Sequence, residues 1–317
     1  MMRMVMLLAL AAFAVLAGLS GCASLNAEKR APMLGDQIDV DGVRMHVLTQ
    51  GPRDSAKPPV VLIHGASVNL RDMKIALGDE LAADRFVVMI DRPGRGYSER
   101  PGEGFRLETQ AALIKGAVDA LGVERPIIVG QSFGGAVALR YALEYQDTMS
   151  GLVLLAPVSH EWPGGVVWYN RAAATPVLGV FFRRLVIPAY GALVAKQAVE
   201  ASFEPDTPPN DYYERAGVSL LFRARDFKAN ATDIVHLKDE IRAQQTRYDA
   251  IELPVAIATG TSDSTVSPDI HSKTLAKEIN GAGLTLLPDT GHALHHAETE
   301  AIVEIINAIV SDGVPAN

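Results

Sequence analysis

The sequence predicts an α/β protein in which helices cover both faces of an open, mostly parallel β-sheet. Three observations indicate this class: short apolar runs that do not alternate, helix-like stretches between those runs, and a glycine-rich turn at residues 130–135. Strands buried on both faces give continuous apolar runs, and they occur mainly in parallel sheets. Strands that alternate with helices along the chain favour the same architecture.

The composition allows a large core and excludes several functions. The chain has 317 residues, of which 48% are apolar, and this is enough for a large domain. Its 37 acidic residues outnumber the 29 basic residues, whereas a broad nucleic-acid surface needs clustered cations. We therefore expect no nucleic-acid partner. The single cysteine, Cys22, can form neither an internal disulfide nor a thiolate metal site.

The first residues predict a targeting signal. Arg3 gives a positively charged start, and the apolar run of residues 5–17 is too short to cross a hydrocarbon core of about 30 Å. Residues 19–22, Leu-Ser-Gly-Cys, resemble a bacterial lipobox. The resemblance implies that residues 1–21 are a signal peptide and that Cys22 becomes the acylated N-terminus, with palmitate among its lipids. The alternative is an ordinary secretory signal with an incidental cysteine.

Lipidation at Cys22 would anchor the protein in a membrane of the bacterial cell envelope. Three acyl chains give lasting attachment, because each buried CH₂ contributes roughly 0.8 kcal/mol and a single chain binds only marginally. By the same resemblance, Ala23 in place of aspartate favours the outer membrane, facing the periplasm. Residues 22–34 are small, polar and interrupted by proline, so we expect a tether between the lipid and the folded domain.

The elements of the core follow in order. Residues 38–48 alternate around the turn Asp41-Gly42, which predicts a β-hairpin. The buried strands are expected at residues 60–63, 86–90, 127–129, 152–155, 255–258 and 284–287. Helices are expected near residues 74–83, 107–121, 133–145, 269–280 and 298–311. Residues 35–158 and 251–317 are therefore interpreted as the two parts of one core domain.

The segment between these two parts has a different pattern. Residues 159–250 contain no clear strand, but they hold several prolines and many aromatic side chains. A structureless loop of this length would be exceptional, so we interpret the segment as a helical cap. Its aromatic side chains can form a small core of their own or line a substrate pocket, and the sequence leaves both possibilities open.

The turn Gly130-Gln131-Ser132-Phe133-Gly134-Gly135 has the pattern of a nucleophile. It follows a predicted strand and precedes a predicted helix, which is the context that a G-x-S-x-G elbow requires. Residues the size of glycine, two before and two after the serine, let the strand and the helix pack closely. The hydroxyl also lies at a helix N-terminus, which favours developing negative charge. Ser132 is therefore the predicted nucleophile; the alternative is a purely structural turn.

A serine nucleophile needs a base and an orienting carboxylate. His292 follows the last predicted strand and Asp263 follows the strand before it, so both lie at the sheet edge where active sites of open parallel sheets occur. We predict that His292 takes the proton of Ser132 and that Asp263 orients His292. The order Ser132, Asp263, His292 along the chain is the one expected for such an elbow. Taken alone, Asp263 could equally be a turn cap.

Two backbone N–H groups are predicted to form the oxyanion hole. The loop His64-Gly65-Ala66-Ser67 follows a predicted strand, and Phe133 follows the nucleophile. We assign the N–H groups of Ala66 and Phe133 to this role, in which the loss of one donor typically costs about 2.7–4 kcal/mol. His64 itself is interpreted as structural.

A metal site is the other interpretation of the histidines near the C-terminus. His292, His295 and His296 lie close together in the sequence. However, no second group with ligand spacing accompanies them, and the zinc motif H-E-x-x-H is absent from the sequence. We therefore expect no metal and no cofactor, and we interpret His295 and His296 as ordinary residues at the start of a helix.

These motifs together resemble the α/β-hydrolase family, in particular its epoxide-hydrolase, haloalkane-dehalogenase and haloperoxidase-like branch. The resemblance spans about residues 35–312 and is carried by His64-Gly65, residues 91–98 (Asp-Arg-Pro-Gly-Arg-Gly-Tyr-Ser), residues 130–135, Asp263 and Gly291-His292. It implies an eight-stranded, mostly parallel sheet with a helical cap insertion. It also implies that Asp91 and its loop are mainly architectural.

One departure from those relatives indicates the chemistry. Epoxide hydrolases and haloalkane dehalogenases carry aspartate at the elbow, where this chain has Ser132. An ester formed on a carboxylate can be hydrolysed, whereas serine would form a stable ether with an epoxide or a haloalkane. We therefore expect a serine hydrolase that cleaves small to medium carboxylic esters, lactones or thioesters through an acyl-enzyme. The alternatives are C–C bond hydrolysis or perhydrolysis by the same triad, or a non-catalytic ligand-binding homologue.

Overall fold

The computed structural model describes the chain except residues 1–17, 19–20, 23, 188–190 and 312–317. Within the described part, eight strands form one sheet in the order β1-β2-β4-β3-β5-β6-β7-β8. The strands are β1 (Asp36–Val40), β2 (Val43–Gln50), β3 (Val60–Ile63), β4 (Val87–Ile90), β5 (Ile127–Gln131), β6 (Gly151–Leu155), β7 (Val255–Gly260) and β8 (Gly283–Leu287). Only the pairs β1–β2 and β2–β4 are antiparallel. The predicted eight-stranded, mostly parallel sheet is confirmed.

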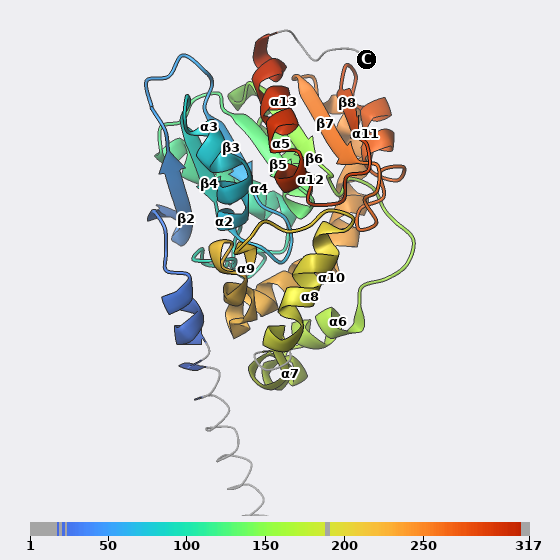
Figure 1. Ribbon diagram of the computed structural model, residues 1–317. Coiled ribbons are helices and arrows are strands. Elements are labelled where there is room, and N and C mark those ends of the chain that lie inside the picture. Colours follow the sequence, from blue (N-terminus) through green and yellow to red (C-terminus); the bar gives the residue numbers. More distant parts are fainter. Residues whose placement is uncertain (1–17, 19–20, 23, 188–190, 312–317) are drawn as a thin grey trace, which may run out of the picture.

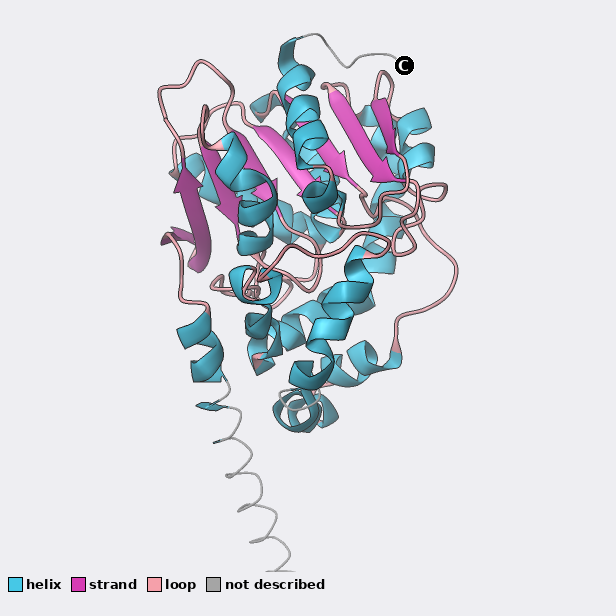
Figure 2. Cartoon of the chain, in the orientation of Figure 1, coloured by secondary structure: helices cyan, strands magenta, loops and turns pink. Residues whose placement is uncertain are grey.

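Helices cover both faces of this sheet, as Figures 1 and 2 show. One face packs against α4 (Leu107–Ala120), α5 (Phe133–Tyr145) and α11 (Ser272–Glu278). The other face packs against α2 (Leu70–Met73), the π-helical turn η1 (Lys74–Gly78), α3 (Asp79–Leu81) and α13 (Thr299–Ser311).

Strand β3 shows why its sequence is continuously apolar. Val61 and Ile63 belong to the core on one face, and Val60 and Leu62 belong to the core on the other. All four are fully buried. Successive side chains of a strand point to opposite faces, so a strand covered on both sides needs apolar residues at every position.

The segment between β6 and β7 is a helical insertion at one edge of the sheet (Figure 1). Its helices are α6 (Trp168–Ala174), α7 (Leu178–Val186), α8 (Ala192–Phe203), α9 (Tyr212–Arg215) and α10 (Ala224–Gln244), with the 3-10 helices η4 (Val218–Phe222) and η5 (Gln245–Ala250). The long helix α10 packs against α6 and α7. Ala173, Ile187, Phe227 and Ala231 form a small buried cluster inside the insertion.

The segment before β1 differs from the expected tether. Residues 24–30 are helical, and Ala27 and Ala31 are buried against Leu220 of the insertion. The hydroxyl of Tyr97 donates to the Ala31 carbonyl at 2.7 Å. Part of the expected tether of residues 22–34 is therefore a helix packed on the body, which its small alanine side chains allow to approach closely. Most of the predicted signal peptide, residues 1–21, lies outside the described residues.

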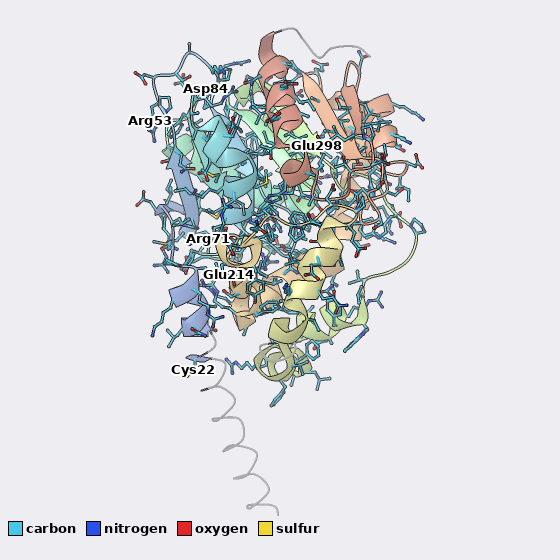
Figure 3. The ribbon with its side chains drawn as sticks, in the orientation of Figure 1. Cys22, Arg53, Arg71, Asp84, Glu214 and Glu298 are labelled. Carbon is cyan, nitrogen blue, oxygen red and sulfur yellow. The ribbon has the colours of Figure 1, made fainter. Side chains whose placement is uncertain are left out.

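Cys22 lies at the outer end of this packed segment. It is exposed and carries a free thiol, and Figure 3 shows it away from the body of the molecule. Among the helices of the described part, none combines the length and the hydrophobicity that crossing a membrane requires.

Candidate active site

Ser132 lies on a strained turn between β5 and α5. Its backbone has φ 54° and ψ −115°, and residues that carry a side chain normally avoid a positive φ. A Cβ on Gly134 would lie only 2.3 Å from the carbonyl oxygen of Ile63, and a Cβ on Gly130 would lie 2.4 Å from the carbonyl oxygen of Gly134. Only glycine fits at these two positions, so the strand and the helix can pack closely around the strained turn.

The structure brings the three predicted triad residues together. The imidazole Nε2 of His292 lies 3.0 Å from the Ser132 hydroxyl oxygen, and its Nδ1 lies 2.7 Å from a carboxylate oxygen of Asp263. The other carboxylate oxygen of Asp263 accepts from the backbone N–H groups of Thr265 and Val266, at 2.8 and 2.9 Å. The carboxylate is thereby fixed as the acceptor for Nδ1–H, which leaves Nε2 to accept the serine proton.

Gln131 is a neighbour of the triad that the sequence analysis did not identify as functional. It is buried, and its side-chain N–H lies 3.4 Å from both Nε2 and the carbonyl oxygen of His292. Its carbonyl oxygen faces Gly65, because a Cβ there would lie 2.2 Å from Oε1. Gln131 therefore connects the loop that carries His292 with the loop that carries Ala66.

The loop of residues 64–67 passes directly beside the nucleophile. A Cβ on Gly65 would lie 3.3 Å from Cβ of Ser132. Neither the Ala66 nor the Phe133 N–H group donates to an acceptor among the residues that the structure describes. Two backbone donors next to a nucleophile are what an oxyanion hole requires.

Arg92 holds the loop of residues 64–67 in place through its backbone carbonyl groups. Its guanidinium donates to the carbonyl oxygens of His64 and Gly65, both at 3.0 Å, and to the carboxylate of Asp233 on α10 at 3.0 Å. Burial lowers the pKa of Arg92 to about 10, so it stays cationic at neutral pH. Asn230, also on α10, accepts from the Ser67 N–H at 2.7 Å. Helix α10 of the insertion therefore helps to hold the loop.

His64 has a structural environment, in agreement with its interpretation from the sequence. It is fully buried, its Nδ1 lies 2.8 Å from the Gly65 carbonyl oxygen, and its Nε2 accepts from the Arg92 backbone N–H at 3.0 Å. Burial, together with the charge of Arg92, lowers its pKa to about 3. His64 is thus a neutral imidazole with both nitrogens occupied.

A second buried polar cluster lies near the triad, and the sequence analysis missed it. The carboxylate of Asp72 accepts from Nε2 of His295 and Nε2 of His296, both at 2.9 Å, and from the Tyr212 hydroxyl at 2.6 Å. Burial opposes the charge of Asp72, but the two imidazoles hold its pKa well below the usual range. The ligand atoms of Asp72, His295 and His296 lie within 4.8 Å of one another, a spacing that could hold a metal ion. The three hydrogen bonds already give Asp72 its partners.

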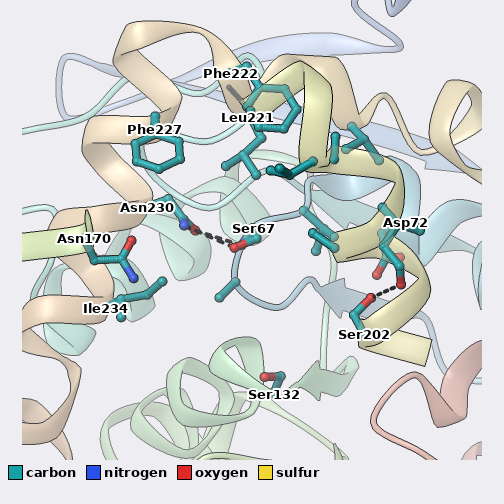
Figure 4. A pocket seen from close by; sticks show the side chains of 18 of the residues that line it. Ser67, Asp72, Ser132, Asn170, Ser202, Leu221, Phe222, Phe227, Asn230 and Ile234 are labelled. Carbon is teal, nitrogen blue, oxygen red and sulfur yellow. Dashed lines mark hydrogen bonds between the residues drawn. The ribbon is translucent and has the colours of Figure 1, made fainter. Parts of the chain in front are cut away.

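A cavity of about 840 Å³ opens above Ser132 and His292. Figure 4 shows it between the nucleophile and side chains of the insertion, among them Leu221, Phe222 and Phe227. Among the described lining residues there is no lysine and no arginine. The polar groups at its wall include Ser67, Asn170 and Asn230. The cavity wall is therefore mainly apolar, and its described residues offer a ligand neither a lysine nor an arginine.

The comparison with protein families agrees with this architecture. Residues 58–299 match the family model of the alpha/beta hydrolase fold, which is most of the chain. The protein belongs to the α/β-hydrolase fold family.

Several known proteins are similar to this chain. The chain is 29% identical to 2-hydroxymuconate semialdehyde hydrolase of Pseudomonas putida, over 86% of this chain and 94% of that protein. It resembles the enol-lactonase from Burkholderia xenovorans LB400 with a TM-score of 0.69 and 21% identity, covering 87% of this chain and 100% of the other. A thermophilic esterase from Thermogutta terrifontis gives a TM-score of 0.68 and 19% identity, covering 87% and 97%. The two structural similarities show the shared fold.

Proposed function

We propose that this protein is a serine hydrolase that cleaves uncharged carboxylic esters or lactones through an acyl-enzyme. The observation that carries the proposal is the continuous path of hydrogen-bonding atoms from Ser132 through His292 to Asp263, with distances of 3.0 and 2.7 Å. The two N–H groups beside Ser132 support the same chemistry, because they can hold the oxyanion of a tetrahedral intermediate.

The proposed reaction has two steps. Ser132 attacks the carbonyl carbon while His292 takes the hydroxyl proton, and the N–H groups of Ala66 and Phe133 stabilise the oxyanion. His292, now an imidazolium stabilised by Asp263, gives the proton to the leaving alkoxide. A water molecule, activated by His292, then hydrolyses the acyl-enzyme and restores Ser132.

The wall of the cavity favours an uncharged substrate. An anionic substrate buried there would need a cationic partner, since an unpaired charge in an apolar site is costly. None of the described lining residues is a lysine or an arginine. We therefore infer that the substrates are neutral esters or lactones with an apolar part that the insertion covers.

Covalent labelling with a fluorophosphonate tests the proposal. The wild-type chain should be labelled, and Ser132→Ala and His292→Ala should not, while both variants keep the thermal unfolding temperature of a folded protein. Hydrolysis of a series of neutral p-nitrophenyl esters and γ-lactones should depend on the same residues. Labelling that persists in Ser132→Ala would place the nucleophile elsewhere, and no labelling of folded wild-type protein would favour a ligand-binding homologue.

Hydrolysis of a C–C bond is the second candidate function. It is supported by the similarity to 2-hydroxymuconate semialdehyde hydrolase over nearly the full length of that protein. The same triad could serve, with a carbon leaving group that must be protonated. A muconate is an anion, however, and the described lining residues of this pocket include no lysine or arginine to pair with it. Turnover of 2-hydroxymuconate semialdehyde with a kcat/KM above that for neutral esters would reverse this preference.

We also propose that Cys22 carries the lipid anchor of a membrane-bound form in the bacterial cell envelope. The lipobox-like sequence of residues 19–22 supports this proposal. The exposed thiol at the end of the packed helix leaves Cys22 accessible for modification. The outer membrane is the proposed location, on the basis of Ala23 in place of aspartate.

A further inference from the structure

Helices α6 and α7 carry most of the exposed large apolar side chains of the described chain. Their surface, called here the α6–α7 face, consists of Val167, Trp168, Tyr169, Val177, Leu178, Phe181 and Val186. Leu178 is 75% exposed and Trp168 is 69% exposed. In the rest of the described chain only Leu25, Met33 and Leu286 are comparable. An apolar cluster of this kind, unlike scattered single residues, marks an interaction surface.

The charge of this region is opposite to that of the whole protein. The chain has a net charge of −8, but residues 162–199 contain no aspartate or glutamate. The same residues include four cations, Arg171, Arg183, Arg184 and Lys196. Arg171 and Lys196 are exposed, whereas Arg183 is buried and donates to the Ala173 carbonyl oxygen. A surface that combines aromatic and aliphatic side chains with cations is typical of elements that lie in a membrane interface and contact anionic lipids.

Four residues of this face also line the active-site cavity. Val167, Trp168, Tyr169 and Val186 line the cavity, and each of them is also exposed at the surface. Because these residues both line the cavity and carry exposed surface, we place the mouth of the cavity at this face. A ligand that enters here passes the α6–α7 face before it reaches Ser132.

The N-terminal segment leaves the body at the same end of the molecule. Figure 1 shows the packed helix of residues 24–30 and α7 at the end of the molecule away from the C-terminus. Figure 3 shows Cys22 at this end. Leu25, 60% exposed, adds an apolar side chain next to Cys22. A lipid on Cys22 would therefore hold the α6–α7 face close to a bilayer.

We propose that the α6–α7 face is a membrane-docking surface, seated among lipid headgroups, and that the active-site cavity opens toward the bilayer. The occupant of the face is thus a lipid surface with anionic headgroups, not a second copy of the chain. The docking itself is independent of the enzymatic activity. Its consequence, that the ester substrates enter from the membrane, rests on the function proposed above.

Vesicle binding by an unlipidated chain tests the docking directly. A chain that begins at Ser24 retains every buried cluster of the described residues, among which Ala27 is the first buried one. It should co-sediment with phosphatidylcholine vesicles that contain phosphatidylglycerol, and bind vesicles of phosphatidylcholine alone more weakly. With Trp162→Phe, Trp168 is the only tryptophan, and its fluorescence should shift to the blue on binding.

Variants on the α6–α7 face should weaken vesicle binding by amounts that can be stated in advance. Leu178→Ser should weaken binding roughly tenfold or more, because a large apolar side chain is no longer buried in the interface. Arg171→Gln should weaken binding to the anionic vesicles about fivefold, the value for one cation near such a surface. Leu286→Ser is the matched control, because it removes an exposed leucine from β8, away from this face, and it should leave binding unchanged.

The outcomes separate docking from catalysis. Leu178→Ser should lower kcat/KM for an ester presented in vesicles and not for the same ester in solution, and Ser132→Ala should bind vesicles like the unaltered chain. Vesicle binding that survives Leu178→Ser, or that Leu286→Ser weakens equally, would overturn the proposal. So would a concentration-dependent dimer, detected by sedimentation, that Leu178→Ser abolishes while no vesicle binding occurs.

Discussion

The guanidinium of Arg92 lies 4.1 Å from the centre of the Phe133 ring, so one side chain contacts both predicted halves of the oxyanion hole. It stacks on the residue after the nucleophile, and it also donates to the carbonyl oxygens of His64 and Gly65. Its charge is balanced by Asp233 on α10. The insertion is thereby connected to the oxyanion loop through a buried ion pair.

We expect Arg92→Lys to lower kcat roughly tenfold to a hundredfold with little change in KM. Lysine keeps the charge, but its donors all lie on one nitrogen and do not reproduce the spread of the guanidinium over two carbonyl oxygens and Asp233. The donors of the oxyanion hole therefore lose their fixed position. Steady-state kinetics with a neutral ester measure the effect. Arg100→Lys is the control, because Arg100 also pairs with Asp233, at 2.6 Å, without contacting the loop. Equal loss of kcat in both variants would mean that Arg92 acts only through stability.

Asp263→Asn should lower kcat by about 10²–10⁴-fold and leave the protein folded. Its Oδ1 can still accept from Thr265 and Val266, which places the amide N–H₂ against Nδ1 of His292. Two donors then face each other, and the imidazole adopts the tautomer that cannot accept the serine proton. Single-turnover kinetics, together with thermal unfolding, check this expectation. Activity within tenfold of the wild type would exclude Asp263 as the orienting carboxylate.

His271 should make the fold less stable in acid. Its Nδ1 accepts from the backbone N–H groups of Ser159 and His160, at 3.2 and 3.1 Å, and burial lowers its pKa to about 4. The unfolded chain takes up the proton near pH 6.5, so the stability from this residue is present above that pH. It is lost as the pH falls toward 4, by up to about 3 kcal/mol.

Urea unfolding between about pH 7 and pH 4.5 measures this loss. His271→Gln should be less stable than the wild type at neutral pH and should lose less free energy of unfolding on acidification. His236→Gln, a change at a partly exposed residue of α10, is the control and should keep the wild-type dependence. If His271→Gln also kept the wild-type pH dependence of the free energy of unfolding, protonation of His271 would not contribute to the loss of stability in acid.

The sequence predicted the sheet and the triad for the same physical reason. Continuous apolar runs such as Val60–Ile63 are required wherever both faces of a strand are covered, and the catalytic loops follow the ends of such strands. The elbow was recognisable because only glycine fits at residues 130 and 134. Each of these signals is local, so it can be read from a few adjacent residues.

The features that the sequence analysis missed depend on contacts between distant residues. Asp72 lies 223 positions before His295, and nothing in the surrounding sequence of either residue indicates their hydrogen bond. The N-terminal segment looked like a tether because its alanines are small, yet the same smallness lets Ala31 pack beside Leu220. Burial of this kind follows from the assembled fold, which periodicity does not specify.

The Asn170 amide should contribute to substrate choice rather than to stability. It lines the cavity and is only 4% exposed, and its side-chain carbonyl oxygen has no hydrogen-bond partner among the described residues. Asn170→Leu removes this unsatisfied group, so the free energy of unfolding should stay the same or rise by about 1 kcal/mol. In Asn170→Leu, the rate of hydrolysis of an ester with an amide in its acyl chain should fall about three- to tenfold relative to the rate for the matching alkyl ester, because the substrate amide loses its hydrogen-bond partner.

The variant Ile234→Val is the control that separates loss of the Asn170 amide from a general change in the cavity wall. Ile234 lines the same cavity, and Figure 4 shows it next to Asn170. This variant changes the packing of the wall without removing a polar group, so the ratio of the two ester rates should not change. Marked destabilisation of Asn170→Leu, with both esters affected alike, would show that the amide is structural.

Cys22→Ser should release the protein from the membrane fraction of a bacterial host. Without the thiol no diacylglycerol can be attached, and the acyl chains that hold the protein in the bilayer are lost. Metabolic labelling with palmitate should mark the wild-type chain and not the variant, and fractionation by carbonate extraction should move the variant to the soluble fraction.

If the α6–α7 face docks as proposed, part of the variant should return to anionic vesicles at low salt and dissociate as the salt is raised, because the cations of that face are screened. Palmitate labelling of Cys22→Ser would contradict the assignment of the lipid to this residue.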